Sequence, residues 1–327
     1  MRGAATLPSD HAACSGCSLC LLVCPVWRRS HDLALTPHGR AKALQNGVAA
    51  SEMADSIDSC TLCGACRPVC PEEIDPVDML IALRRKSALT ASWPARLAEP
   101  VHQLPPRTSV SRMLLADPLL LAQPASVARI TALLGGAAGL PVAADNGADI
   151  ALALETGTLL PQRRLEHFLA PLRDYAALIV TDGLLCRQLV RWLPKTRIVG
   201  LGEALSSLPG VRSRLRHTDL YVIEPRAYHA DYQRLVKYYD RLRKERGCDL
   251  NLDLQRIAIP ATLRSLSQRL SGTAPDDGEQ IGWLLEGRKM SRIVAESFED
   301  YLALAQASPC EVVHLADLLE EENHAHG

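Results

Sequence analysis

The sequence predicts two domains: a small helical domain that binds metal through cysteines, followed by an α/β domain with a mostly parallel sheet. Three observations lead to this prediction. The chain has 327 residues, which suits two domains better than one. Eight of its 11 cysteines form two tight groups near the N-terminus. From about residue 149, short apolar runs alternate with longer amphipathic segments. We therefore assign 1–90 to the helical domain, 91–148 to a proline-rich linker with helices, and 149–327 to the α/β domain.

The bulk composition is that of an ordinary globular protein, with 47% apolar and 22% charged residues. The formal net charge of −1 predicts no general attraction to nucleic acid or to a membrane surface. Met1–Asp10 lacks the pattern of a secretory signal, so we expect a cytoplasmic protein without disulfides. Peripheral association with the inner face of the membrane, through partner proteins, stays open as an alternative. No apolar stretch is long enough to span a bilayer. Met113–Ala122 comes nearest, but it contains Asp117 and Pro118 and predicts a packing helix or a surface segment.

The clustered cysteines form two runs with the same spacing, each followed by proline. These are Cys14, Cys17, Cys20, Cys24 and Pro25, then Cys60, Cys63, Cys66, Cys70 and Pro71. Thiolates suit iron–sulfur clusters, and four cysteines in eleven residues are typical of [4Fe–4S] sites. Zinc sites more often use two widely separated pairs. The runs therefore predict two [4Fe–4S] clusters.

In this pattern the fourth cysteine of each run points away from its own loop and binds the other cluster. We therefore assign cluster 1 to Cys14, Cys17, Cys20 and Cys70, and cluster 2 to Cys60, Cys63, Cys66 and Cys24. Gly16 and Gly64 would let the backbone approach the clusters, where amides can bond to sulfide.

Helical segments are expected between and after the two runs. Gly39–Ala50 and Ala54–Ser59 have helical character. Asp75 can cap a helix that begins at Pro76 and ends in the basic residues Arg84 to Lys86. The first domain therefore looks like an α-helical ferredoxin. Beyond it, prolines between Trp93 and Pro124 predict a linker.

The C-terminal part alternates between predicted strands and helices, which is typical of a parallel sheet with helical crossovers. We expect strands at Ile150–Leu154, Ala176–Val180, Arg197–Val199 and Leu220–Ile223. We expect helices at Arg163–Leu172, Leu184–Leu193 and Tyr228–Arg246. The alternation continues through Ile281–Leu285, Met290–Phe298 and Val312–Leu315, and the tail Glu320–Gly327 is expected to fray.

Over Cys14–Lys86 the chain resembles a group of iron–sulfur proteins. This group includes the iron–sulfur subunits of glycolate oxidase and anaerobic glycerol-3-phosphate dehydrogenase, lactate-utilisation iron–sulfur proteins and heterodisulfide reductase subunits. Besides the cysteines, the segment Leu35-Thr36-Pro37-His38-Gly39-Arg40 is similar to the group's S-P-R-G-R segment. The resemblance implies electron transfer, with a flavin dehydrogenase as donor and a quinone-linked or cytochrome subunit as acceptor.

In that group a pair of cysteine-rich C-C-G domains usually follows, and the C-terminal part resembles a degenerate form of them. Ile179–Cys186 is similar to a motif with two cysteines but keeps only Cys186. Thr158 and Arg226 stand where other cysteines belong, and no C-C-G triplet occurs. We therefore interpret Cys186, Cys248 and Cys310 as structural thiols. We expect a C-terminal domain that docks partners and holds no cofactor.

Other residues near the runs allow simpler interpretations. Five basic residues either form a positive rim for an acidic partner or are a solvated charged face; they are Arg28, Arg29, Arg40, Lys42 and Arg67. The histidines His11, His31 and His38 are not needed as ligands because all eight cysteines are present. Leu134–Gly139 is glycine-rich but lacks the residues of a phosphate loop, so a turn is expected.

Together these observations predict an electron-transfer subunit of a multi-subunit oxidoreductase, without catalytic residues of its own. Two alternatives stay open. One is a heterodisulfide-reductase-like subunit that acts on thiols or disulfides, for which Cys186 would be the test residue. The other is a redox-sensing iron–sulfur protein, although the sequence contains no DNA-binding motif.

Overall fold

The computed structural model describes residues 9–87, 111–271 and 277–319. It divides the chain into two compact units, and each is made of separate stretches of sequence. The first comprises 1–98, 152–159 and 263–276, and the second comprises 99–151, 160–262 and 277–327. Residues 91–110 of the predicted proline-rich linker and the predicted fraying tail lie outside the described residues. Within those residues, no helix is long and apolar enough to cross a membrane.

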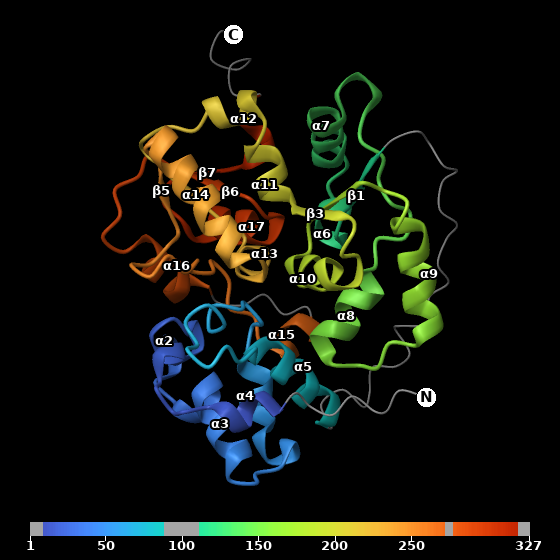
Figure 1. Ribbon diagram of the computed structural model, residues 1–327. Helices are drawn as coiled ribbons and strands as arrows, with labels where there is room; N and C mark the ends of the chain where they lie inside the picture. Colours follow the sequence, from blue (N-terminus) through green and yellow to red (C-terminus); the bar gives the residue numbers. More distant parts are fainter. Residues whose placement is uncertain (1–8, 88–110, 272–276, 320–327) are drawn as a thin grey trace. The chain divides into compact units, whose positions relative to one another are not determined.

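The first unit is helical, as the sequence predicts (Figure 1). Its α-helices are α1 (Leu19–Leu22), α2 (Pro25–Ser30), α3 (Pro37–Gln45), α4 (Ala54–Ser59), α5 (Pro76–Lys86) and α15 (Leu266–Ser271). Its 3-10 turns are η1 (Ser9–Ala13), η2 (Leu33–Leu35) and η3 (Ala50–Met53).

Helix caps set the ends of these helices. The side chain of Asp75 accepts from the amides of Val77 and Asp78, so the predicted start of α5 at Pro76 is confirmed. Helix α3 begins two residues before the predicted Gly39, because Thr36 caps it through the Gly39 amide. It also ends five residues before the predicted Ala50, and Gly47 then turns the chain with φ +80°.

Two later stretches complete the first unit. One is the end of α8 (Ala148–Thr156), where the Glu155 carbonyl accepts from Arg84 at 2.7 Å. The other contains α15, where the amide and hydroxyl of Ser267 donate to the Asp58 carboxylate at 2.7 and 2.9 Å. The helical unit is therefore assembled from three parts of the chain.

The second unit contains two sheets, and the predicted parallel arrangement is confirmed in both. One has the order β1-β2-β3, and the other has the order β5-β4-β6-β7, with every named pair parallel. The strands are β1 (Arg112–Leu115), β2 (Ala177–Val180), β3 (Arg197–Gly200), β4 (Asp219–Val222), β5 (Asp249–Leu250), β6 (Arg292–Ala295) and β7 (Glu311–His314).

Helices connect the strands of this unit (Figure 1). The first set is α6 (Pro118–Leu121), α7 (Pro124–Gly135), the start of α8, α9 (Gln162–Leu172), α10 (Gly183–Trp192), α11 (Leu201–Ser206) and α12 (Pro209–Ser213). The second set is α13 (Pro225–Ala230), α14 (Tyr232–Arg246), α16 (Gly278–Leu285) and α17 (Phe298–Ala307). Short 3-10 turns, η6 (Gly136–Ala138) and η7 (Leu315–Asp317), follow α7 and β7. The predicted turn after Leu134 is therefore present.

Three sequence predictions in this unit are wrong. Ile150–Leu154 is not a strand but lies within α8, because a short apolar run carries no period that separates a strand from a buried helix. Met113–Ala122 is neither one helix nor a surface segment: it contains most of the buried strand β1 and then α6, which starts at Pro118. Tyr228–Arg246 is two helices, since Asp231 leaves the helical region at φ −127° and ψ 48°.

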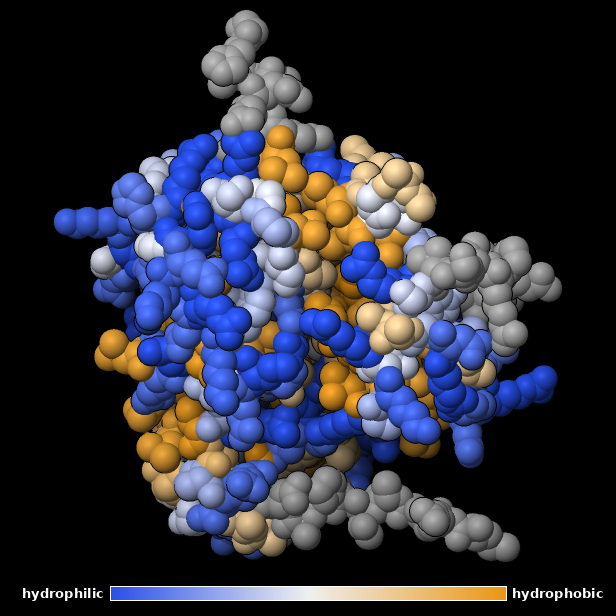
Figure 2. Space-filling view, turned by 45° about the horizontal axis from the view of Figure 1, so that its top comes forward, coloured by the Kyte–Doolittle hydropathy of each residue, from blue (hydrophilic) through white to orange (hydrophobic). Residues whose placement is uncertain are grey.

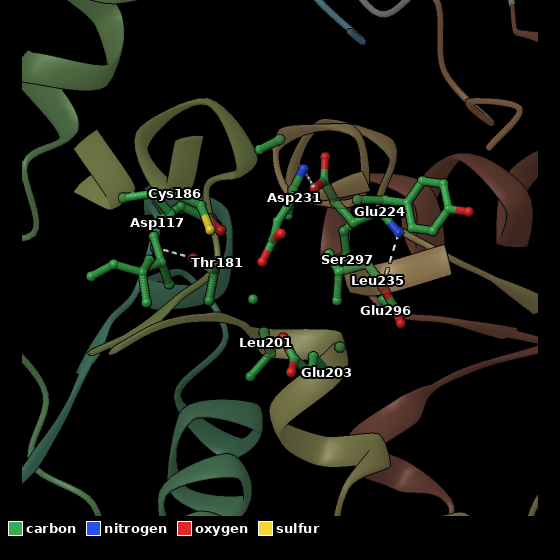
Figure 3. Close-up of a pocket in the computed structure, with 18 of the residues that line it drawn as sticks. Asp117, Thr181, Cys186, Leu201, Glu203, Glu224, Asp231, Leu235, Glu296 and Ser297 are labelled. Carbon is green, nitrogen blue, oxygen red and sulfur yellow. Dashed lines mark hydrogen bonds between the residues drawn. The ribbon is translucent and has the colours of Figure 1, made fainter. Parts of the chain in front are cut away.

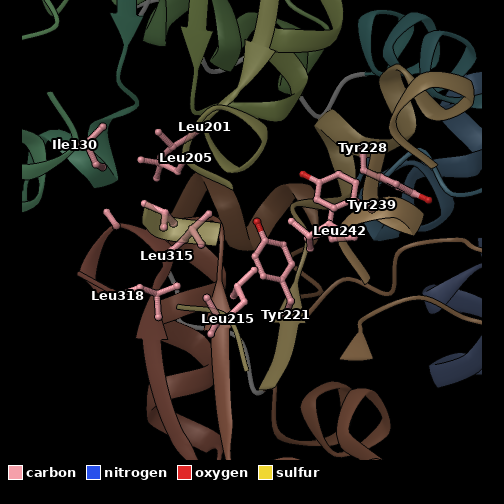
Figure 4. Close-up of a cluster of buried hydrophobic side chains, with 14 of the residues drawn as sticks. Ile130, Leu201, Leu205, Leu215, Tyr221, Tyr228, Tyr239, Leu242, Leu315 and Leu318 are labelled. Carbon is pink, nitrogen blue, oxygen red and sulfur yellow. The ribbon is translucent and has the colours of Figure 1, made fainter. Parts of the chain in front are cut away.

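The core of the second unit follows the alternation of its strands. On β4, Tyr221 packs into the larger cluster with α13 and α14, whereas Leu220 and Val222 pack into a smaller cluster with α16 and α17. Helices therefore cover both faces of the larger sheet. Figure 4 shows Tyr221 close to Tyr239 and Leu242, which lie on α14.

Gly202 lies where two strand ends approach closely. A Cβ atom at this position would overlap the carboxyl group of Glu296, which follows β6. That carboxyl cannot easily move, because the hydroxyls of Tyr221 and Tyr239 donate to it at 2.7 and 2.6 Å. We expect Gly202→Ala to lower the free energy of unfolding by about 1–3 kcal/mol in urea denaturation, as overpacking of a core does.

Gly282 provides the matched control, because it lies in α16 and a Cβ atom there would meet nothing within 4 Å. Gly282→Ala is expected to stabilise the protein by about 0.5–1 kcal/mol through helix propensity alone. Equal effects of the two substitutions would contradict the close approach at Gly202.

Candidate metal centre and a second pocket

All eight clustered cysteines lie in the first unit as free thiols. Cys17 is exposed, Cys24 is buried, and the other six are partly buried. Their electrostatic neighbours show which thiols lie together. The thiol of Cys20 is influenced by Cys14, Cys17 and Cys70, which are the other three members of predicted cluster 1.

The thiols of predicted cluster 2 also lie together. Cys63 is influenced by Cys60 and Cys24, and Cys66 by Cys63, Cys60 and Cys24. The fold thus brings Cys24 to the second run and Cys70 to the first. Cys20 also acts electrostatically on Cys66, more weakly than Cys63, Cys60 and Cys24 do, so the two sets adjoin.

The two cysteine loops share a backbone conformation. In each loop the residues two and four positions after the first cysteine have positive φ. These are Gly16 (+82°) and Ser18 (+65°) in the first loop, and Leu62 (+55°) and Gly64 (+79°) in the second. Alternation of right- and left-handed residues turns successive amides toward one concave side, which is a common way to hold an anionic iron–sulfur group.

Charge supplies a second test of whether these residues fit a cluster. Burial, together with neighbouring cysteines, raises the pKa of Cys20 to about 11 and of Cys63 to about 12. The pKa of Cys66 is raised well above its usual value for the same reasons. Thiols held in this way become thiolates when cations share their charge, as the irons of a cluster do. The donor set and the loops therefore fit [4Fe–4S] clusters.

Polar side chains hold the first loop in place. Lys42 Nζ and Gln45 Nε2 donate to the Cys14 carbonyl at 3.1 and 2.9 Å. Gln45 also donates to the carbonyl of His11 at 2.8 Å, so that η1 and the loop are held together. Lys42 is thus a brace for the loop and not simply part of a solvated face.

Arg40 corrects another expectation, because it belongs to neither a positive rim nor a solvated face. It is 2% exposed and donates to the carbonyls of Leu35 and Ser56 at 3.0 and 2.8 Å. Arg28 and Arg29 are exposed, and Arg67 forms an ion pair with Asp75 at 3.5 Å. Only part of the predicted basic group is therefore available to a partner.

The three remaining cysteines lie in the second unit. Cys186 and Cys248 are buried, at 5% and 1% exposure, and Cys310 is partly buried. Burial raises the pKa of the Cys186 thiol above its usual range, and nearby Glu224 and Asp182 raise it further. A thiol held in this way is a poor nucleophile, which weighs against chemistry on thiols or disulfides at Cys186.

A pocket of about 670 Å³, including its opening to solvent, lies in the second unit where strands of both sheets end. Figure 3 shows Asp117, Thr181 and Cys186 on one side and Glu224, Glu296 and Ser297 on the other. Glu203, on α11, lies between them at the bottom of this view. Five carboxylates line the pocket: Asp117, Glu203, Glu224, Asp231 and Glu296.

Sequence reasoning missed these acidic residues, although part of the signal was present. Asp117, Glu224 and Ser297 each follow a strand and cap the next helix through their side chains. A polar cap between a strand and a helix is readable in sequence. Their convergence is not readable, because it depends on how the two sheets meet.

Residues 10–74 match the family described as a 4Fe-4S dicluster domain. This match covers both cysteine runs and ends just before α5. No curated protein and no solved structure matches the chain. The first unit therefore contains an iron–sulfur domain of the kind that serves electron transfer.

Proposed function

We propose that the protein is the electron-transfer subunit of a multi-subunit oxidoreductase, and that it holds two [4Fe–4S] clusters. The observation that carries the proposal is the pairing of Cys24 with the second run and of Cys70 with the first. Such pairing places two four-thiol sets side by side. When bound, each cluster supplies a site that takes up and releases one electron.

The chain's own residues would bind and orient the clusters. The crossed cysteines fix the separation of the two sets, and the positive-φ loops turn amides toward the bound sulfides. One set contains Cys24, the buried cysteine of the two runs. Cys17, the exposed cysteine, leaves the other set closer to solvent and to a partner.

The partners proposed from the family resemblance are a flavin dehydrogenase as donor and a quinone-linked or cytochrome subunit as acceptor. Surface chemistry around the first run supports a docking role. Leu19, Leu22 and Leu33 are 42%, 67% and 44% exposed, and Arg28 and Arg29 lie close by in sequence. Figure 2 shows hydrophobic side chains gathered in patches on a surface with many hydrophilic residues. Exposed apolar side chains near charges are typical of protein contacts.

The first test is iron and acid-labile sulfide on anaerobically purified protein, followed by EPR of the reduced sample. We expect about eight irons and eight sulfides per chain and the spectrum of two interacting clusters. The cluster-loaded chain should accept electrons from a reduced flavoprotein but should not oxidise a hydroxy acid by itself. Oxidation of such a substrate by the chain alone would contradict the subunit role, and zinc with little iron would contradict the clusters.

A further inference from the structure

The pocket of the second unit lies where α/β proteins most often bind ligands. Strands β2, β3, β4 and β6 all end beside the pocket. The residues that follow them and line the pocket are Thr181, Leu201, Glu224 and Glu296. The carboxyl ends of parallel strands form a common edge, and the loops and helix starts that follow can surround a ligand there. None of the eight clustered cysteines lines this pocket.

Carboxyl groups outnumber basic groups in the lining, with five acidic residues and one arginine. Arg234 is the single basic residue among the lining residues, and its guanidinium is already engaged. It donates to both oxygens of Glu203 at 2.5 and 2.8 Å and to Asp231 at 2.5 Å. Asp117 and Glu224 have no such ion pair in the described part of the chain: their side chains accept from backbone amides at helix starts.

Glu296 is also held without a cation. It accepts from the hydroxyls of Tyr221 and Tyr239 and from the Glu224 amide at 2.9 Å. Burial raises the pKa of both Glu224 and Glu296 to about 7, although nearby Arg226 offsets part of the rise for Glu224. A positive group inside the pocket would favour the charged form of both carboxylates.

The rest of the lining is apolar, including Leu120, Ile198 and Phe298. Cys186 adds a buried thiol whose sulfur faces the space between the two sides in Figure 3, and its side chain makes no hydrogen bond in the described residues. This apolar wall fits the hydrocarbon part of an organic cation better than the water shell of a metal ion.

We propose that this pocket binds a small organic cation, an amine or guanidinium carried on a short apolar chain or ring. The carboxylates receive the positive group, and the apolar wall from α6, β3 and α17 contacts the remainder. This binding site is independent of the clusters, so its test does not depend on the proposed electron transfer.

The test is isothermal titration calorimetry on the full cluster-loaded chain with putrescine, agmatine and benzylamine. The matched uncharged probe is 1,4-butanediol, which has the same carbon chain as putrescine. We expect saturable binding of at least one amine and none of the diol. The proposal is overturned when no amine binds at millimolar concentration, when the diol binds as well, or when Mg²⁺ competes for the same site.

Two variants locate the binding. Asp117→Asn removes a charge but keeps the cap of α6, because asparagine caps helices as well as aspartate does. We expect it to weaken amine binding by about tenfold or more, the value of one charge-assisted hydrogen bond. Asp240→Asn is the control, since Asp240 pairs with Arg256 and does not line the pocket. It should change the affinity by less than about twofold, and equal losses in both variants would exclude the pocket as the site.

Discussion

Replacing Cys14 and Cys70 together by alanine is expected to lower the iron content by about four irons per chain. Replacing either cysteine alone is expected to cause the same loss. The reason is that both thiols belong to one predicted cluster, since Cys70 and Cys14 both act on Cys20. Removing Cys14 and Cys24 together is expected to cost about eight irons, because Cys24 lies with Cys60 and Cys63. Both double variants lose two cysteines, so they control for each other.

The measurement is iron and sulfide per chain after anaerobic reconstitution, with EPR of the reduced variants. If each run bound its own cluster, the result would be reversed: Cys14→Ala with Cys70→Ala would empty both sites, and Cys14→Ala with Cys24→Ala would empty one. The same experiment therefore distinguishes the crossed assignment from the uncrossed one. Alanine is preferred because a serine oxygen could still bind iron.

Replacing Arg84 by methionine is expected to lower the free energy of unfolding by about 3–5 kcal/mol. Arg84 is fully buried and joins α5 to the segment 57–60 and to the end of α8. Its guanidinium donates to the carbonyls of Ile57, Cys60 and Glu155 at 3.3, 2.6 and 2.7 Å, and it lies 3.5 Å from the Glu155 carboxylate. Methionine fills similar space but leaves these buried acceptors without a strong donor.

The bond to the Cys60 carbonyl links this stability to the site. We expect the Arg84→Met variant to lose the iron of cluster 2 before that of cluster 1. The measurement is iron release during a urea titration under anaerobic conditions. Arg85→Met is the matched control: it is the same change on the next residue of α5. The Arg85 side chain is exposed and, among the described residues, donates only to the Gly157 carbonyl. Its cost should stay below about 1 kcal/mol. Equal costs at the two positions would contradict the role of Arg84.

Predictions from the sequence succeeded where the signal was local. Asp75 and Pro76 are adjacent, and together they specify the start of α5. The parallel sheets follow from apolar runs separated by helices, and β2 and β4 were placed within one residue. The helix α8 was missed because Ile150–Leu154 is apolar on all sides and too short to show a period.

The residues of the candidate sites also differ in whether their sequence signal is local. Cysteine spacing is local, so the eight candidate ligands could be named from the sequence, and their role as ligands stays a prediction. Arg84 could be recognised only as a basic residue at a helix end, because its partner Glu155 is distant in sequence. The pocket could not be foreseen, since Asp117 and Glu296 meet only after two sheets have formed.

The composition of the helical unit from three stretches of chain has a consequence for biosynthesis. Its last contacts, from Ser267 to Asp58, become possible only when α15 has left the ribosome. At usual rates of translation this occurs roughly 10 to 40 s after α5 has been made. During that interval the nascent cysteine loops are present without their later supports. The helical unit, and with it the setting of the cysteine loops, is therefore complete only after α15 has been translated.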